Sequence, residues 1–107
     1  MDNLPPEIEA TLARLSAYRA VRGVMILARA AGGAGGGIVQ STGAVFDGDS
    51  GRRYAGAVER VVAATTSAVA TVEEGDQLRL MRIRTKRHEL IITPDDKYLL
   101  VVLQDPQ

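Results

Sequence analysis

The chain has 107 residues, of which 46% are hydrophobic, and its thirteen basic and thirteen acidic side chains cancel. This size and composition predict a single domain, residues 1–107, whose hydrophobic core is large enough to be stable without disulfide bonds. The absence of cysteine excludes a disulfide framework or a thiolate metal site, and the zero net charge supplies no field toward nucleic acid or an anionic membrane. With no leader-like apolar segment and no run of roughly 20 apolar residues, we expect a soluble intracellular protein.

A short amphipathic helix is predicted over residues 3–18. Pro5 and Pro6 suit its first turn, where a missing N–H costs little because the first helical N–H groups have no partner. Its apolar side chains recur at helical spacing and form one narrow stripe, Ile8, Leu12 and Leu15. We expect this helix to lie on a sheet or on a partner.

Two strands and a glycine-rich connection follow. Residues 21–29 carry four consecutive apolar side chains, which is typical of an inner strand covered on both faces. The Gly/Ala run 30–37 predicts a flexible hairpin loop, and residues 37–42 predict a short return strand at a sheet edge.

The strongest periodic signal predicts a long helix from about residue 51 to residue 72. We expect Asp49 or Ser50 to cap it. The apolar and small side chains that trace one helical face are Tyr54, Val58, Val61, Val62, Thr65, Ala68, Val69 and Val72.

The last part of the chain predicts a three-stranded antiparallel meander, residues 78–85, 89–93 and 98–103, with two short polar turns. The element order is then helix, strand, strand, helix, strand, strand, strand. It predicts an α+β fold, a five-stranded antiparallel sheet covered by helices on both faces.

No catalytic or metal-binding constellation is visible. The glycine run lacks the Lys-Ser/Thr and the helix that a phosphate-binding loop requires. His88 is the only histidine and has no partner at metal-ligand or triad spacing, so a turn residue is the simpler interpretation. Glu73, Glu74 and Asp76 follow a helix end and are interpreted as a solvated turn. We therefore expect no enzyme, no cofactor and no metal.

A basic run between residues 77 and 88 contains no carboxylate, and its members are Arg79, Arg82, Arg84, Lys86 and Arg87. Phosphate binding would explain it, but no aromatic side chain lies among these residues to stack on bases. Two other interpretations stay open. The charges protect a sheet edge from uncontrolled pairing, or the edge pairs with a second copy or faces an acidic peptide.

The segment 78–106 resembles the C-terminal half of roadblock-type dynein light chains. The matching features are Arg82-Ile83-Arg84, the basic Lys86-Arg87 turn, Leu90-Ile91-Ile92, Pro94-Asp95, Tyr98-Leu99 and Gln104-Asp105-Pro106. The segments 7–15 and 21–27 resemble the family's opening helix and first strand, and Ser41-Thr42 matches the end of its second strand. The glycine-rich loop departs from the family's short first hairpin.

The resemblance implies a noncatalytic homodimer, or a heterodimer with a related light chain, whose two sheets join into one of ten strands. It implies binding of the dynein intermediate chain, hence a cytoplasmic, microtubule-associated accessory subunit of the motor. Distant relatives are scaffolds that regulate small GTPases, which is the alternative. We expect the dimer seam at Leu78, Leu80, Met81, Arg82, Ile83 and Arg84, and partner binding on the face of Ile8, Leu12 and Leu15.

Overall fold

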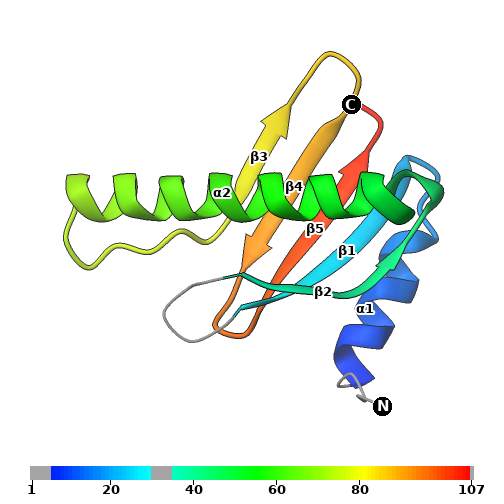
Figure 1. Cartoon of the computed structure of the whole chain (residues 1–107), viewed down its shortest axis with the longest axis horizontal. Helices are drawn as coiled ribbons and strands as arrows, with labels where there is room; N and C mark the ends of the chain where they lie inside the picture. Colours follow the sequence, from blue (N-terminus) through cyan, green and yellow to red (C-terminus); the bar gives the residue numbers. More distant parts are fainter. Residues whose placement is uncertain (1–5, 30–34, 107) are drawn as a thin grey trace.

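The computed structural model describes residues 6–29 and 35–106. It confirms the predicted α+β class, a five-stranded antiparallel sheet with α1 and α2 on opposite faces (Figure 1). The elements are α1 (Pro6–Ser16), β1 (Val21–Arg29), β2 (Gly35–Thr42), the 3-10 turn η2 (Ala44–Phe46), α2 (Gly48–Val72), β3 (Met81–Arg84), β4 (Glu89–Pro94) and β5 (Tyr98–Gln104). The sheet order is β2-β1-β5-β4-β3, so β2 and β3 are the edges.

The sheet divides the core into two layers because successive strand residues point to opposite faces. On the α2 face, the fully buried side chains are Met25, Leu27, Ile92, Val101 and Leu103. On the α1 face, the buried side chains are Leu12, Val24, Ile26 and Val102. The four consecutive apolar residues of β1 therefore serve both layers, which confirms that β1 is an inner strand covered on both sides.

The connection between β2 and α2 depends on a glycine. Gly43 has a φ of 94°, and a Cβ there would lie 2.1 Å from the carbonyl oxygen of Arg22. Only glycine combines this backbone conformation with so close an approach. The turn lets Phe46 fold back into the α2-face core, where its ring meets Tyr54 edge-on at 5.3 Å between centroids.

The predicted cap of the long helix is wrong. The helix begins at Gly48, three residues before the expected start, and the cap residue is Asp47, whose side chain makes no capping hydrogen bond. Ser50 already lies inside the first turn, where its hydroxyl donates to the carbonyl oxygen of Val45 at 2.6 Å. Both candidate caps, Asp49 and Ser50, are therefore helical residues.

The meander is confirmed, with a shorter first strand. The expected strand 78–85 is reduced to β3, Met81–Arg84, whose ladder with β4 ends at the Met81–Ile92 pair. Alternate backbone positions of β4 face β3, and the next such position after Ile92 is Pro94. Proline has no N–H to donate, so the ladder cannot continue there. The Asp95 carboxylate accepts hydrogen bonds at 2.9 Å from the N–H groups of Lys97 and Tyr98 and so fixes the β4–β5 turn.

Smaller differences concern the first half of the chain. The first helix runs over Pro6–Ser16 within the expected span, and β2 starts at Gly35 rather than residue 37. Residues 30–34 of the predicted loop lie outside the described residues. Within the described part of the chain, no helix has the length and hydropathy needed to span a bilayer.

Candidate protein-interaction surfaces

The described residues contain no group of three or more histidine, aspartate or glutamate side chains placed to hold a metal ion. His88 lies in the β3–β4 hairpin, where its carbonyl oxygen accepts from the N–H of Thr85 at 2.8 Å. Glu73 follows the end of α2 and Asp76 binds its own neighbour's N–H, so both lie in an exposed turn. These residues therefore lie in the connections expected for them, and the functional candidates among the described residues are surfaces.

The first surface is the edge strand β3. Met81 and Ile83 are half-buried and pack against the α2-face core, while Arg82 and Arg84 point to the α1 face and are exposed. Among the described residues, the backbone of β3 pairs with β4 on one side and with no strand on the other. Its other side presents hydrogen-bonding groups that a further strand can satisfy.

The expected faces of two seam residues need correction. In a regular strand Leu78 and Leu80 would share the face of the arginines. The structure instead packs Leu78 against the α2-face core and leaves Leu80 58% exposed. The alternation fails because residues 77–80 pair with no strand in the described part of the chain.

The second surface is the C-terminal half of α2. Val58 and Val62 are each 4% exposed because they lie on the sheet, whereas Val72, on the same helical face, is 85% exposed. Figure 1 shows why: the last turns of α2 project past β3, beyond the edge of the sheet. Toward the end of α2 the stripe therefore loses its cover within the described part of the chain: Ala68 and Val72 are exposed, whereas Thr65 and Val69 are half-buried.

A hydrogen-bonded cluster holds the edge strand to the sheet. The Glu89 side chain is 6% exposed, and its two oxygens accept from Nε of Arg82 at 2.6 Å and from Nε2 of Gln104 at 2.9 Å. The bond from Arg82, and next the bond from Gln104, hold the pKa of Glu89 below its usual range against an opposing desolvation. The three residues belong to β3, β4 and β5, so the cluster ties three neighbouring strands together.

A second ion pair fastens the end of β5. Nε and Nη2 of Arg22 donate to the two carboxylate oxygens of Asp105 at 2.8 and 2.9 Å, in the fork geometry that suits arginine. These bonds lower the pKa of the Asp105 carboxyl. No role of Glu89 or Asp105 was predicted from the sequence. A usable signal existed for Glu89, since it opens a strand that must pair with the arginine-bearing strand.

The third surface is the α1 face. Leu12 is 6% exposed and packs on Val24, Ile26 and Val102, so its expected availability to a partner is wrong. Ile8 and Leu15 are half-buried beside it. The exposed part of this face lies next to α1, over β4 and β5.

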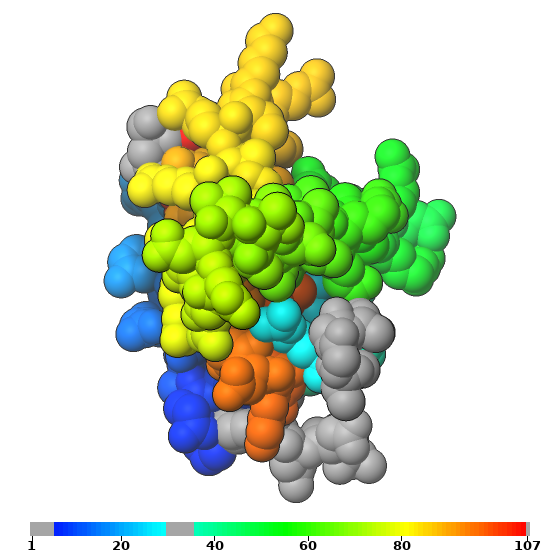
Figure 2. All heavy atoms as spheres, turned by 90° about the vertical axis from the view of Figure 1, so that its left-hand side faces the viewer, coloured from blue at the N-terminus to red at the C-terminus, as the bar shows by residue number. Residues whose placement is uncertain are grey.

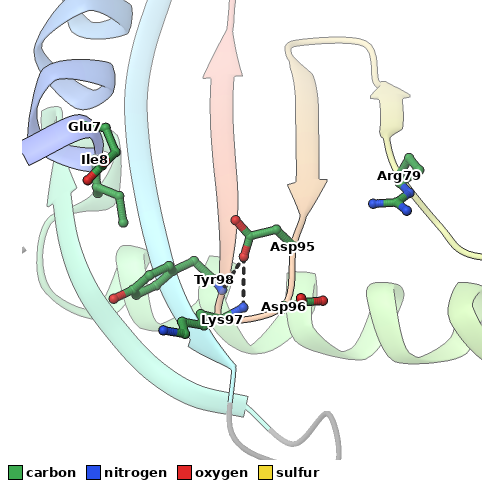
Figure 3. A pocket seen from close by; sticks show the side chains of 7 residues that line it. All are labelled: Glu7, Ile8, Arg79, Asp95, Asp96, Lys97 and Tyr98. Carbon is green, nitrogen blue, oxygen red and sulfur yellow. Dashed lines mark hydrogen bonds between the residues drawn. The ribbon is translucent and has the colours of Figure 1, made fainter. Parts of the chain in front are cut away.

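Two hollows open along α1. One has a volume of about 180 Å³ and is lined by Ile8, Thr11, Ile26, Thr93, Asp95, Tyr98 and Leu100. The other, of about 430 Å³, is shown in Figure 3 and is lined by Glu7, Ile8, Arg79, Asp95, Asp96, Lys97 and Tyr98. They share Ile8, Asp95 and Tyr98, so they form one groove between α1 and the β4–β5 turn. Its floor is apolar and its outer end is charged.

An α+β sheet with an edge strand open on one side, a half-covered helix beside it and no metal cluster in the described residues has the features of a protein-interaction domain. A family model for the Roadblock/LC7 domain matches residues 7–104, and the chain belongs to this family. The resemblance inferred from the C-terminal motifs is thereby confirmed.

Solved structures show the same fold at low sequence identity. The crystal structure of a Roadblock/LC7 domain from Streptomyces avermitilis aligns with a TM-score of 0.72 and 16% identity, over 90% of this chain and 73% of that one. MglB from Myxococcus xanthus aligns with a TM-score of 0.73 and 19% identity, over 96% and 79% of the two chains. An MglB with a tetrameric arrangement aligns with a TM-score of 0.70 and 17% identity, over 98% and 76%. None of the three is described as a dynein subunit.

Proposed function

We propose that the chain is a noncatalytic homodimeric scaffold that binds and regulates a small GTPase. The observation that carries the dimer is the apolar stripe of α2, which continues past the edge of its own sheet. A second copy related by a two-fold axis would cover this half-helix and pair its β3 with the open edge. Ten strands would then form one sheet, with both α2 helices on the same side.

The side chains at this seam suit such an arrangement. Val61, Val72 and Leu80 are three large apolar side chains with exposed fractions of 36%, 85% and 58%. In an isologous interface each of these side chains is buried in both subunits, so each contributes twice to the stability of the dimer. In this proposal Met81 and Ile83 serve their own core as well as the seam, because they are half-buried within one chain.

The choice of a GTPase as partner follows from the relatives. The family includes scaffolds that regulate small GTPases, and two of the similar structures are MglB chains. The family also includes dynein light chains. The second candidate is therefore a dynein light chain that binds the intermediate chain, and the C-terminal motifs favour it. A microtubule-associated location belongs to that candidate alone.

Affinity capture with the tagged chain, followed by mass spectrometry of the bound proteins, tests the choice. The proposal expects a small GTPase whose affinity for the purified chain differs between its GDP-bound and GTP-bound forms. Capture of a dynein intermediate chain, with no nucleotide-dependent partner, would overturn the GTPase assignment. Light scattering on the same preparation measures the mass independently, and a monomer would overturn the dimer.

A further inference from the structure

We infer that the α1 face of the dimer is a second docking surface, and that it takes an acidic, amphipathic segment of a protein partner. This inference rests on the proposed dimer for its full extent. It concerns the side of the sheet opposite the two α2 helices, which the proposed function leaves unused. Three observations support it: the charge of β3, the apolar strip beside it, and the groove along α1.

The β3 segment makes one end of the α1 face basic. Between residues 77 and 94 the chain carries five Lys/Arg residues, and Glu89 is the single carboxylate. Arg82 and Arg84 point to the α1 face, and Figure 2 shows the hairpin that follows them projecting from the body. Glu89 holds Nε of Arg82 while 59% of that side chain stays exposed. The guanidinium is thus fixed in place but remains open to a ligand.

An apolar strip leads from these arginines into the groove. Arg82 is paired across the ladder with the half-buried Ile91, and Thr93, two residues further along β4, is paired with Leu100. Leu100 and Thr93 line the hollow of about 180 Å³. One continuous path therefore runs from charged β3, over apolar β4 and β5, to the side of α1.

Dimerisation through β3 doubles the basic end. Antiparallel pairing of two β3 strands across a two-fold axis brings two copies of Arg82 and two of Arg84 to the middle of the joined sheet. Glu89 balances part of this charge, and the exposed remainder of the four guanidinium groups can donate charge-assisted hydrogen bonds to carboxylates of a ligand. Each groove then extends outward from this central strip toward its own α1.

The chemistry of the face selects a peptide over a lipid surface or nucleic acid. The far end of the groove carries Glu7, Asp95 and Asp96, so the face is not uniformly basic, as attraction to an anionic bilayer would require. No aromatic side chain lies among the arginines to stack on bases. The fitting occupant has carboxylates over Arg82 and Arg84 and one apolar side chain seated beside Leu100.

Selection from a random display library tests this inference directly. The library presents peptides of about 12 residues, enough for three helical turns. The wild-type chain is expected to enrich peptides with Asp or Glu on one side of a Leu, Ile or Phe. Binding of a selected peptide should weaken when ionic strength rises from about 0.01 to about 0.15 M, because the Debye length falls from about 30 to about 8 Å.

Two variants and a matched control locate the site. The double variant Arg84→Gln with Lys86→Gln should weaken the selected peptide by roughly fivefold, since each exposed charge contributes modestly. Thr93→Glu places a carboxylate on the floor and should weaken it by about as much. The control, Arg53→Gln with Arg60→Gln, removes the same charge from exposed positions on α2 and should leave the affinity unchanged.

Each remaining outcome overturns the inference. They are enrichment of basic or neutral peptides, equal losses in the control variant, the absence of any enriched peptide, and binding to phosphatidylserine vesicles in place of peptides. The mass of the wild-type chain, measured in the same buffer, separates this test from that of the dimer. A monomer that still selects acidic peptides through Arg84 and Thr93 would refute the proposed dimer and retain the groove.

Discussion

Replacing Val72 with lysine should dissociate the dimer and leave the subunit folded. Val72 is 85% exposed in the single chain and lies on the apolar stripe of α2. In one subunit the change is nearly neutral, because exposed substitutions stay within about 0.5 kcal/mol. A cation at the last turn of a helix is mildly favourable besides.

The cost to the dimer follows from burial and symmetry. Full burial of a valine side chain contributes about 1.5–3 kcal/mol. The two-fold axis counts the loss twice, so the dimer loses about 3–6 kcal/mol. At about 1.4 kcal/mol per factor of ten, the dissociation constant should rise at least about 100-fold. Val72→Asp serves as a second variant, since it lacks the aliphatic stem by which lysine reaches water.

Sedimentation equilibrium over a range of concentrations measures the dissociation constant, and far-UV circular dichroism reports the helix content. The matched control is Ala63→Lys, which adds the same charge at an exposed position on the opposite side of α2. It should remain dimeric. If Val72→Lys and Ala63→Lys dissociate equally, or if neither does, then the uncovered stripe of α2 is not the seam.

Three further expectations concern the fold itself. Gly43→Ala should destabilise the protein by at least about 2 kcal/mol in a urea titration, because it combines a left-handed backbone with a clash. The control Gly75→Ala, at a φ of 86° with open space around it, should cost about 1 kcal/mol. Val58→Ala deletes two buried methyl groups and should cost about 2 kcal/mol. Glu89 and Asp105 have lowered pKa values in the folded state, so their stabilisation is present above their unfolded pKa values and is lost as pH falls through the folded ones. The free energy of unfolding, measured as a function of pH, should therefore fall below about pH 4, and it should fall less steeply in the variant Glu89→Gln. An equal pH dependence in the wild type and this variant would contradict the assigned bonds.

The elements with a strong period could be read from the sequence. The α2 stripe and the meander predict one helix and three strands, and the double-sided apolar run of β1 predicts its inner place. The start of α2 could not be predicted from the sequence. The hydroxyl of Ser50 donates to the carbonyl oxygen of Val45 instead of capping the helix, and the turn that brings the two together depends on Gly43. That turn is set by tertiary contact with Arg22, which no local pattern reports.

The sequence was enough to predict which strand forms the candidate site, but not which way the side chains of that segment point. The basic run identified β3 as an edge strand, and the structure places it there. Periodicity assigned Leu78 to the wrong face because ladder partners are invisible in one strand alone. A partner was expected on the face of Ile8, Leu12 and Leu15 because so short a helix leaves apolar strand surface uncovered, but the Leu12 side chain itself is buried on β1 and β5.

The Arg82-Ile83-Arg84 motif serves both faces of the sheet, and this limits how it can be tested. Ile83 belongs to the α2-face core, and Arg82 satisfies the almost buried carboxylate of Glu89. Replacing either one removes a contact within the subunit before it removes any contact with a partner, because an unpaired buried carboxylate or a cavity destabilises the strand itself. Loss of dimer after such a change would not distinguish a broken seam from a loosened edge. Val72 and Leu80 lack this ambiguity, since each is largely exposed in the single chain. The seam should therefore be tested by substitutions of Val72 on α2 and of Leu80 just before β3. The α1 face should be tested by substitutions of Arg84 and Thr93, with Arg82 and Ile83 left intact in both experiments.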